Sequence, residues 1–146
     1  MNIFFSNNES TLRNLFTFSE TTRKDIKGYT TESDFVKDFP FVPYQFVMTQ
    51  QIFDEIRKHG NAGKHQSKGE RSMLSGFQET AIALKERDEF TLAPFYMFYD
   101  SVHSFLDSSI RLVIERCNKA AENHDGIEKE DVNVLKLLYL IRYIND

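Results

Sequence analysis

The sequence predicts an all-α fold, a helical bundle of about five to six helices, because apolar residues recur three and four positions apart along most of the chain. A clear instance is the series Leu74, Phe77, Ala81 and Leu84. The chain has 146 residues, of which 40% are hydrophobic and 14 are phenylalanine. This composition is typical of a chain that folds around a core, and the length is that of one domain.

Residues 1–34 depart from this pattern. They are polar and rich in Ser, Thr and Asn, and only a short helix from Glu9 to Phe16 would place apolar residues on a shared face. We therefore predict a weakly structured N-terminal segment over residues 1–34, or one that is ordered only by contact with something else. The helical domain is predicted over residues 35–146.

Two local signals set the boundaries of the next helices. Thr31-x-x-Asp34 forms a capping pattern for a short turn through Phe39. Pro43 suits the first turn of the following helix, which is predicted to end at about Lys58. A proline disfavours the α conformation in the residue before it, so the connection between these two elements is expected to be extended.

Three further helices are predicted over about 67–87, 94–117 and 128–145. The first opens with a capping box, S-x-x-E. Pro94 opens the second, and the polar triplet at 107–109 offers a new N-cap that would interrupt it. The third is strongly apolar, so one of its faces is expected to pack on another surface.

Charge and cysteine content narrow the class of protein. The chain carries 22 acidic and 18 basic residues, so its net charge of −4 does not predict a nucleic-acid binder. The single cysteine, Cys117, excludes an internal disulfide and favours a reducing compartment. The N-terminus lacks the features of a secretory signal, and no apolar run approaches the ~20 residues of a membrane span. A cytoplasmic protein with no membrane partner is expected.

One loop, at residues 59–69, combines three glycines with basic residues. Gly60, Gly63 and Lys64 give the pattern G-x-x-G-K-H, whereas a nucleotide P-loop needs G-x-x-x-x-G-K-[ST] between a strand and a helix. The element before the loop is a predicted helix, and no Ser or Thr follows the lysine to hold magnesium. The pattern therefore argues against a nucleotide P-loop.

The same loop suggests a simpler anion site. Lys64, His65, Lys68 and Arg71 place positive charge beside a predicted helix N-terminus, whose free N–H groups favour anions. These residues could contact a nucleotide phosphate or a nucleic-acid backbone. The alternative is a solvated loop without a ligand, which composition alone favours.

The sequence offers no recognisable catalytic or metal-binding residues. No two histidines are spaced four apart and Cys117 has no second cysteine, so a zinc site is not expected. Cys117 lies on an apolar stripe typical of a core position, although its pairing with His103 or His124 as a nucleophile remains open. The carboxylates are scattered along predicted helix faces and form no acid–base pair.

Three segments resemble, in the same order, parts of the large P-loop protein of bacteriophage exclusion (BREX) defence systems, the BrxC or PglY family. They are FPFVPYQF at 39–46, EIRKHGNAGKHQSKGERSMLSGFQETA at 55–81 and PFYMFYDSVHSFLD at 94–107. The stretch DVNVLKLLYLIRYI at 131–144 is also similar to that family. The resemblance therefore spans roughly residues 35–146.

Members of that family are much longer, and their Walker motifs lie upstream of the matching region, whereas this chain contains neither motif. The resemblance implies an internal fragment, or a truncated reading frame, of such an ATPase. Residues 35–146 would be a helical lid-like domain that follows an AAA+ core and runs into a winged-helix-like segment. No cofactor is implied for this chain, whereas the parent protein would bind ATP and magnesium.

The string KGERSMLSGFQ resembles the sensor-2 element of AAA+ lids, in which an arginine on a helix reaches the γ-phosphate. Arg71 occupies the matching position. The resemblance implies a non-catalytic lid and regulatory segment that contributes this phosphate-sensing arginine. Its partners would be the ATPase core, which this chain lacks, and other BREX subunits, and the isolated chain is not expected to be an enzyme.

The residues leave two other functions open. A helical nucleic-acid-binding module would use Lys64, His65, Lys68 and Arg71, with DNA as the partner and an affinity that falls steeply with salt. A protein-interaction module would instead dock its apolar C-terminal helix on a partner or on a second copy, which would give a homo-oligomer.

Overall fold

The computed structural model describes residues 2–59, 66–88, 90–106 and 108–144, and within these it does not describe the side chains of residues 2, 59 and 66–72. Its helices run in the order α1 (Asn2–Leu15), α2 (Glu32–Asp38), α3 (Pro43–His59), α4 (Gln66–Leu84), η1 (Phe95–Phe98), α5 (Tyr99–Val102), η2 (His103–Phe105), α6 (Ser108–Glu122) and α7 (Lys129–Ile141). The elements η1 and η2 are 3₁₀ helices. The predicted all-α class and helical bundle are confirmed. The winged-helix-like ending is not, because the described residues contain no strand.

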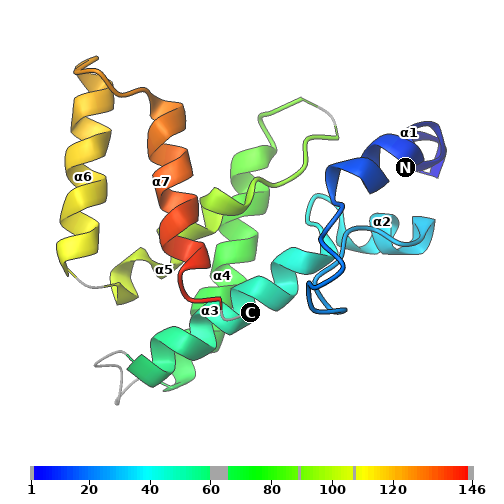
Figure 1. Ribbon diagram of the computed structural model, residues 1–146, viewed down its shortest axis with the longest axis horizontal. Helices are drawn as coiled ribbons and strands as arrows, with labels where there is room; N and C mark the ends of the chain where they lie inside the picture. The colour runs from blue at the N-terminus through cyan, green and yellow to red at the C-terminus, as the bar shows by residue number, and fades with distance from the viewer. Residues whose placement is uncertain (1, 60–65, 89, 107, 145–146) are drawn as a thin grey trace.

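The N-terminal segment is more structured than predicted. Helix α1 begins at Asn2 instead of Glu9, and α1 and α2 pack together around a small core of their own (Figure 1). The helix predicted from Glu9 to Phe16 is thus longer than expected, whereas residues 16–31 form no helix. The apolar pattern of residues 1–34 did not reveal the full length of α1, because the residues against which its buried face packs lie on later segments of the chain. The core residues are Phe5, Leu12, Tyr29, Phe35 and Val42.

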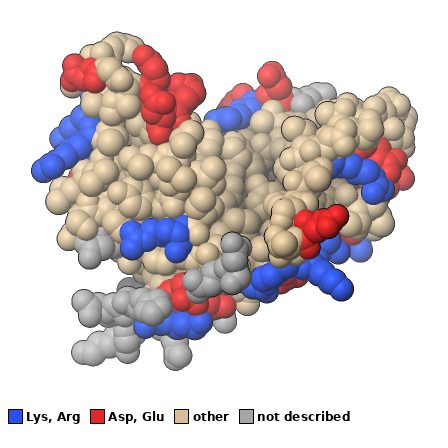
Figure 2. Space-filling view, viewed as in Figure 1, with Lys and Arg blue, Asp and Glu red and all other residues tan. Residues whose placement is uncertain are grey.

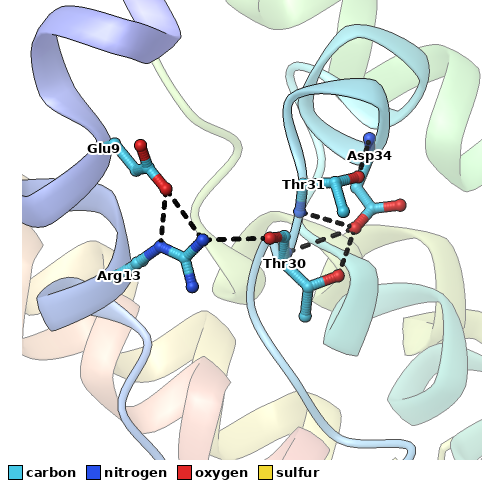
Figure 3. A network of polar contacts seen from close by, with 5 residues as sticks. All are labelled: Glu9, Arg13, Thr30, Thr31 and Asp34. Carbon is cyan, nitrogen blue, oxygen red and sulfur yellow. Dashed lines mark hydrogen bonds and ion pairs between the residues drawn. The ribbon is translucent and has the colours of Figure 1, made fainter.

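A polar network ties α1 to the start of α2 (Figure 3). The guanidinium of Arg13 lies 2.7 Å from a Glu9 carboxylate oxygen and also donates to the carbonyl of Thr30 at 3.1 Å. Thr31 and Asp34 form the predicted capping box, because each side chain accepts from the backbone N–H of the other residue. The turn before α2 is therefore hydrogen-bonded both to α1 and to the first turn of α2.

The main core lies among α3, α4, α5, α6 and α7, at the opposite end of the molecule from α1 and α2 (Figure 1). Helices α6 and α7 pack side by side as an antiparallel pair, and α7 also packs on η1 and α5. Helix α4 packs on α3, η1 and α5. The buried members of this core are Phe41, Ile52, Phe53, Ile56, Leu84, Ala93, Phe95, Phe98, Tyr99, Val102, Leu106, Ile110, Ile114, Val132 and Leu140.

The segment after Pro94 is less regular than the single helix predicted there. It divides into η1, α5 and η2, and a new helix starts at Ser108, close to the predicted interruption. A 3₁₀ turn aligns residues three apart, so Phe95 and Phe98 both enter the core. The apolar spacing was therefore interpreted correctly as a buried face, but spacing alone does not distinguish an α-helix from short 3₁₀ turns.

Gln45 joins the two cores. Its side chain is fully buried at the start of α3, where it accepts the backbone N–H of Val42 at 3.1 Å and donates to the carbonyl of Ala93 at 2.6 Å. The N–H of Ala93 in turn donates to the carbonyl of Pro40. The chain segments before α3 and before η1 are thus clamped together by hydrogen bonds.

None of the helices within the described residues is long and apolar enough to cross a membrane.

Candidate phosphate-contacting site

Helix α4 carries half of the predicted site. It begins at Gln66, one residue before the predicted cap Ser67, so Lys68 and Arg71 lie within its first two turns. The side chains of both residues lie outside the described part of the structure, and Lys64 and His65 lie outside it altogether. The structure therefore locates two of the four residues along a helix and gives no distances among them.

The remainder of α4 is held firmly by aromatic packing. The Phe77 ring lies 4.9 Å from the ring of Phe41, 4.9 Å from that of Phe46 and 4.8 Å from that of Phe98, measured between centroids. Edge-on and offset ring pairs at such distances contribute about 0.5–1.5 kcal/mol each beyond the area that they bury. Phe77 therefore anchors α4 to α3 and η1, six residues after Arg71.

A close backbone approach fixes the same part of α4 against α5. A Cβ atom added at Gly76 would lie 2.6 Å from the Oγ of Ser101 and 2.8 Å from its Cβ. Thr80 and Leu84, further along the helix, are buried. Helix α4 therefore enters the core from Met73 onward, and its first turns extend from this fixed portion toward the end of α3 (Figure 1).

The face of α4 opposite the core is apolar at two exposed positions. Leu74 and Ile82 have exposed fractions of 67% and 61%. The helical repeat places position 71 in line with Ser75 and Gln78, which are exposed on this same side. Position 71 therefore lies along the same line of the α4 backbone as these two exposed residues.

The cationic side chains at the end of α3 are already paired. Arg57 forms an ion pair with Asp54, and Lys58 lies 2.6 Å from a carboxylate oxygen of Glu55. The hydrogen bond to Glu55 and its negative charge raise the pKa of Lys58 above the usual lysine value. Both pairs lie on the helix surface and contribute little stability. Their positive charge is partly neutralised, so they are weaker candidates for an anion contact than the predicted residues.

The other polar groups considered from the sequence lie on other elements than α4. Cys117 is half-buried and packs against the main core, as expected for a residue of the apolar stripe. His103 and His124 are exposed, on η2 and in the turn after α6. In the part of the chain that is described, no three His, Cys, Asp or Glu residues come together as a metal site.

Tyr99 is the most unusual polar group of the main core. It is almost fully buried, its hydroxyl has no hydrogen-bond partner within the described residues, and burial raises its pKa to about 12. Lys136 lies 5.5 Å from the centre of its ring and 3.1 Å from an oxygen of Asp100. At neutral pH the tyrosine is protonated, and this arrangement packs α5 against α7.

Charged side chains are mixed on the surface. On the face drawn in Figure 2, Lys and Arg residues alternate with Asp and Glu over several helices and do not gather into one basic stripe. The described basic side chains drawn there form no continuous groove for a nucleic-acid backbone.

The chain matches no protein-family model, and it matches no solved structure.

Proposed function

We propose that this chain is the non-catalytic lid and regulatory segment of a BREX-type AAA+ ATPase in phage defence, and that Arg71 senses the nucleotide phosphate. ATP and magnesium would be bound by the ATPase core, and the lid would contribute one arginine. The proposal starts from the similarity of residues 39–46, 55–81 and 94–107 to the BrxC or PglY family.

The observation that carries the proposal is the firm anchoring of α4 one to two turns after position 71. Phe77 packs against three other rings, and Gly76 allows close contact with Ser101. The Arg71 position lies about 9 Å before Phe77, at 1.5 Å of rise per residue, and on the side opposite the core. A sensing arginine needs a helix that is held rigidly and a position on that helix that faces away from the core of the lid.

The exposed apolar residues of α4 fit the same proposal. Leu74 and Ile82 lie on the uncovered side of the helix. A lid closes over a core by burying apolar surface, and exposed leucine and isoleucine on the face that carries the arginine would supply it. Contact between that face and the core would deliver Arg71 to the phosphate.

The chemistry required of Arg71 is electrostatic. Its guanidinium is always protonated and can donate two parallel hydrogen bonds to phosphate oxygens. The N-terminal end of α4 adds the positive end of the helix dipole, and Lys68 stands in the same first turns. These groups stabilise negative charge but supply neither a nucleophile nor a base, so the isolated chain should not hydrolyse ATP.

Titration of the purified chain with ATP tests the proposal. The backbone amide signals of residues 67–72 should shift with ATP and much less with AMP, and Arg71→Ala should remove most of the shift. Arg116→Ala, on the exposed face of α6, is the matched control and should change nothing. Magnesium-dependent ATP hydrolysis by the purified chain would contradict the non-catalytic part of the proposal.

DNA binding separates the proposal from its alternative. A nucleic-acid module built on Lys64, His65, Lys68 and Arg71 would bind DNA at about 50 mM salt and lose affinity steeply as salt rises, because bound counterions are released. Such binding, together with no response of residues 67–72 to ATP, would favour that module over the lid. The upstream reading frame gives an independent check, since a lid requires a Walker A motif in the same protein.

A further inference from the structure

Helix α7 has a second apolar face that nothing in the described residues covers. Val132 and Leu140 are buried in the main core, whereas Val134, Leu138 and Ile141 have exposed fractions of 56%, 53% and 38%. These three residues are spaced four and three apart, so they form one stripe on the side away from the core. A helix that is apolar on both sides is typical of one that packs on both sides.

The stripe has opposite charges at its two ends. Glu130 lies one turn before Val134, and Arg142 lies one turn after Leu138. Neither charged side chain forms an ion pair within the described residues. Figure 2 shows acidic side chains where α7 leaves the turn from α6 and basic ones near its other end, with uncharged surface between them.

We propose that this stripe is a self-docking surface, on which α7 of a second copy packs in the antiparallel direction about a twofold axis. In this arrangement Val134 of one copy faces Leu138 of the other, and Glu130 faces Arg142. Each contact occurs twice, because a twofold interface uses the same patch on both copies. The apolar contacts are thereby flanked at each end by one opposite-charge pair.

The charge pattern indicates that the partner is a second copy of this chain and that the two helices pack antiparallel. A parallel pair would place Glu130 beside Glu130 and Arg142 beside Arg142, and like charges face to face oppose association. The antiparallel pair instead brings opposite charges together at both ends, and Ile141 falls level with Asp131 of the other copy, at the edge of the apolar contact. The capping contact of Asp131 with the backbone of Glu128 stays within each copy, so docking does not disturb the start of the helix.

The size of the surface sets the expected strength. A helix of 13 residues is about 20 Å long, so one helix pair buries less than the ~1,600 Å² of a standard interface. We therefore expect a rapidly exchanging dimer with a dissociation constant on the order of 10–100 μM. The stripe lies on α7 and the Arg71 position on α4, so this inference does not depend on the proposed lid function.

Sedimentation equilibrium of the full chain over a range of concentrations tests the inference. The wild-type chain should pass from monomer to dimer, and Leu138→Glu should weaken association at least about tenfold by placing a charge at the centre of the stripe. Leu112→Glu, which changes an equally exposed leucine on α6, is the matched control and should dimerise like the wild type. Circular dichroism establishes that each variant is folded.

Charge reversal tests the packing direction. Glu130→Arg alone would oppose two arginines across each end, and Arg142→Glu alone would oppose two carboxylates, so each variant should be monomeric. An equimolar mixture of the two should associate again, because every facing pair then has opposite charges. A wild-type chain that stays monomeric to about 500 μM, well above the expected dissociation constant, would overturn the inference. A dimer that forms equally well with Leu138→Glu would also overturn the inference. The same holds if the mixture of the two charge-reversal variants does not associate.

Discussion

Gly76 of α4 and Ser101 of α5 lie so close that a Cβ atom at position 76 would stand 2.6 Å from the serine Oγ. Gly76→Ala should therefore lower the free energy of unfolding. Alanine favours a helix over glycine by about 1 kcal/mol, but overpacking of a tight contact costs about 1–3 kcal/mol. Because the serine side chain is short and cannot turn its Cβ away, we expect the cost to exceed the gain. Urea denaturation measures the difference.

Two further variants control that experiment. Adding Ser101→Gly to Gly76→Ala removes both close atoms and should recover part of the lost stability. Ser75→Ala changes the neighbouring exposed residue of α4 and should be neutral or slightly stabilising. A Gly76→Ala chain as stable as the wild type would show that α4 and α5 are not in close contact.

Gln45 should be among the polar residues most costly to replace. Gln45→Ala would leave the N–H of Val42 and the carbonyl of Ala93 without their partner inside the protein, and each unsatisfied buried group costs about 1–3 kcal/mol. We expect a total loss of about 2–6 kcal/mol by chemical denaturation. Gln50→Ala, at an exposed position of α3, should change stability by less than about 0.5 kcal/mol.

Loss of the hydroxyl should change the free energy of unfolding differently at two buried tyrosines. Tyr29 donates to the carbonyl of Phe41 at 2.6 Å, so Tyr29→Phe should cost about 1–2 kcal/mol. The hydroxyl of Tyr99 has no partner within the described residues, so Tyr99→Phe should be neutral or stabilising. Thermal unfolding of both variants measures the contrast, and an equal loss at the two positions would contradict these hydrogen-bond assignments.

Asp34 should make stability depend on pH in acid. The hydroxyl of Thr30 and the backbone N–H groups of Thr30 and Thr31 donate to its carboxylate, and these hydrogen bonds, led by that of the Thr30 hydroxyl, lower its pKa below the ordinary 3.8. The stabilisation is present above the unfolded value of 3.8 and is lost as the pH falls through the lower pKa of the folded state. Asp34→Asn should therefore be less stable than the wild type near neutral pH, with the difference narrowing in strong acid.

The exposed carboxylate of Glu20 provides the control for that pH series. It takes part in no ion pair among the described residues, so Glu20→Gln should change the free energy of unfolding near neutral pH much less than Asp34→Asn does. If the unfolding free energies of Asp34→Asn and the wild type differed by the same amount down to the most acidic pH, the result would contradict a helix cap formed by an ionised Asp34.

Local chemistry made some helix boundaries predictable and left others out of reach. Thr31 with Asp34 and the proline at Pro43 act within one turn, and α2 and α3 begin where those residues indicated. The clamp of Gln45 on Ala93 joins positions 48 residues apart, so no local pattern announces it. The early start of α1 likewise depends on packing against Phe35 of α2.

The sequence predicted where the candidate site lies along the chain but not how its helix is held in place. The sequence placed Lys68 and Arg71 at the start of a helix, and α4 begins close to that point. It did not indicate that Gly76 and Phe77 would fix the following turn so firmly, because their partners lie on α5, α3 and the segments beside them. The proposed role of Arg71 therefore combines a resemblance with packing that the sequence did not reveal.

The most direct test of the lid proposal compares ATP titrations of the wild-type chain, Arg71→Lys and Arg71→Ala by amide chemical shifts. The isolated chain should bind weakly, with a dissociation constant on the order of 1 mM, since the lid proposal assigns the rest of the nucleotide site to the ATPase core. Lysine keeps the charge but loses the paired donors, so Arg71→Lys should bind more weakly than the wild type and more tightly than Arg71→Ala. Identical titrations for the three chains, or shifts centred away from the start of α4, would contradict a phosphate contact by Arg71.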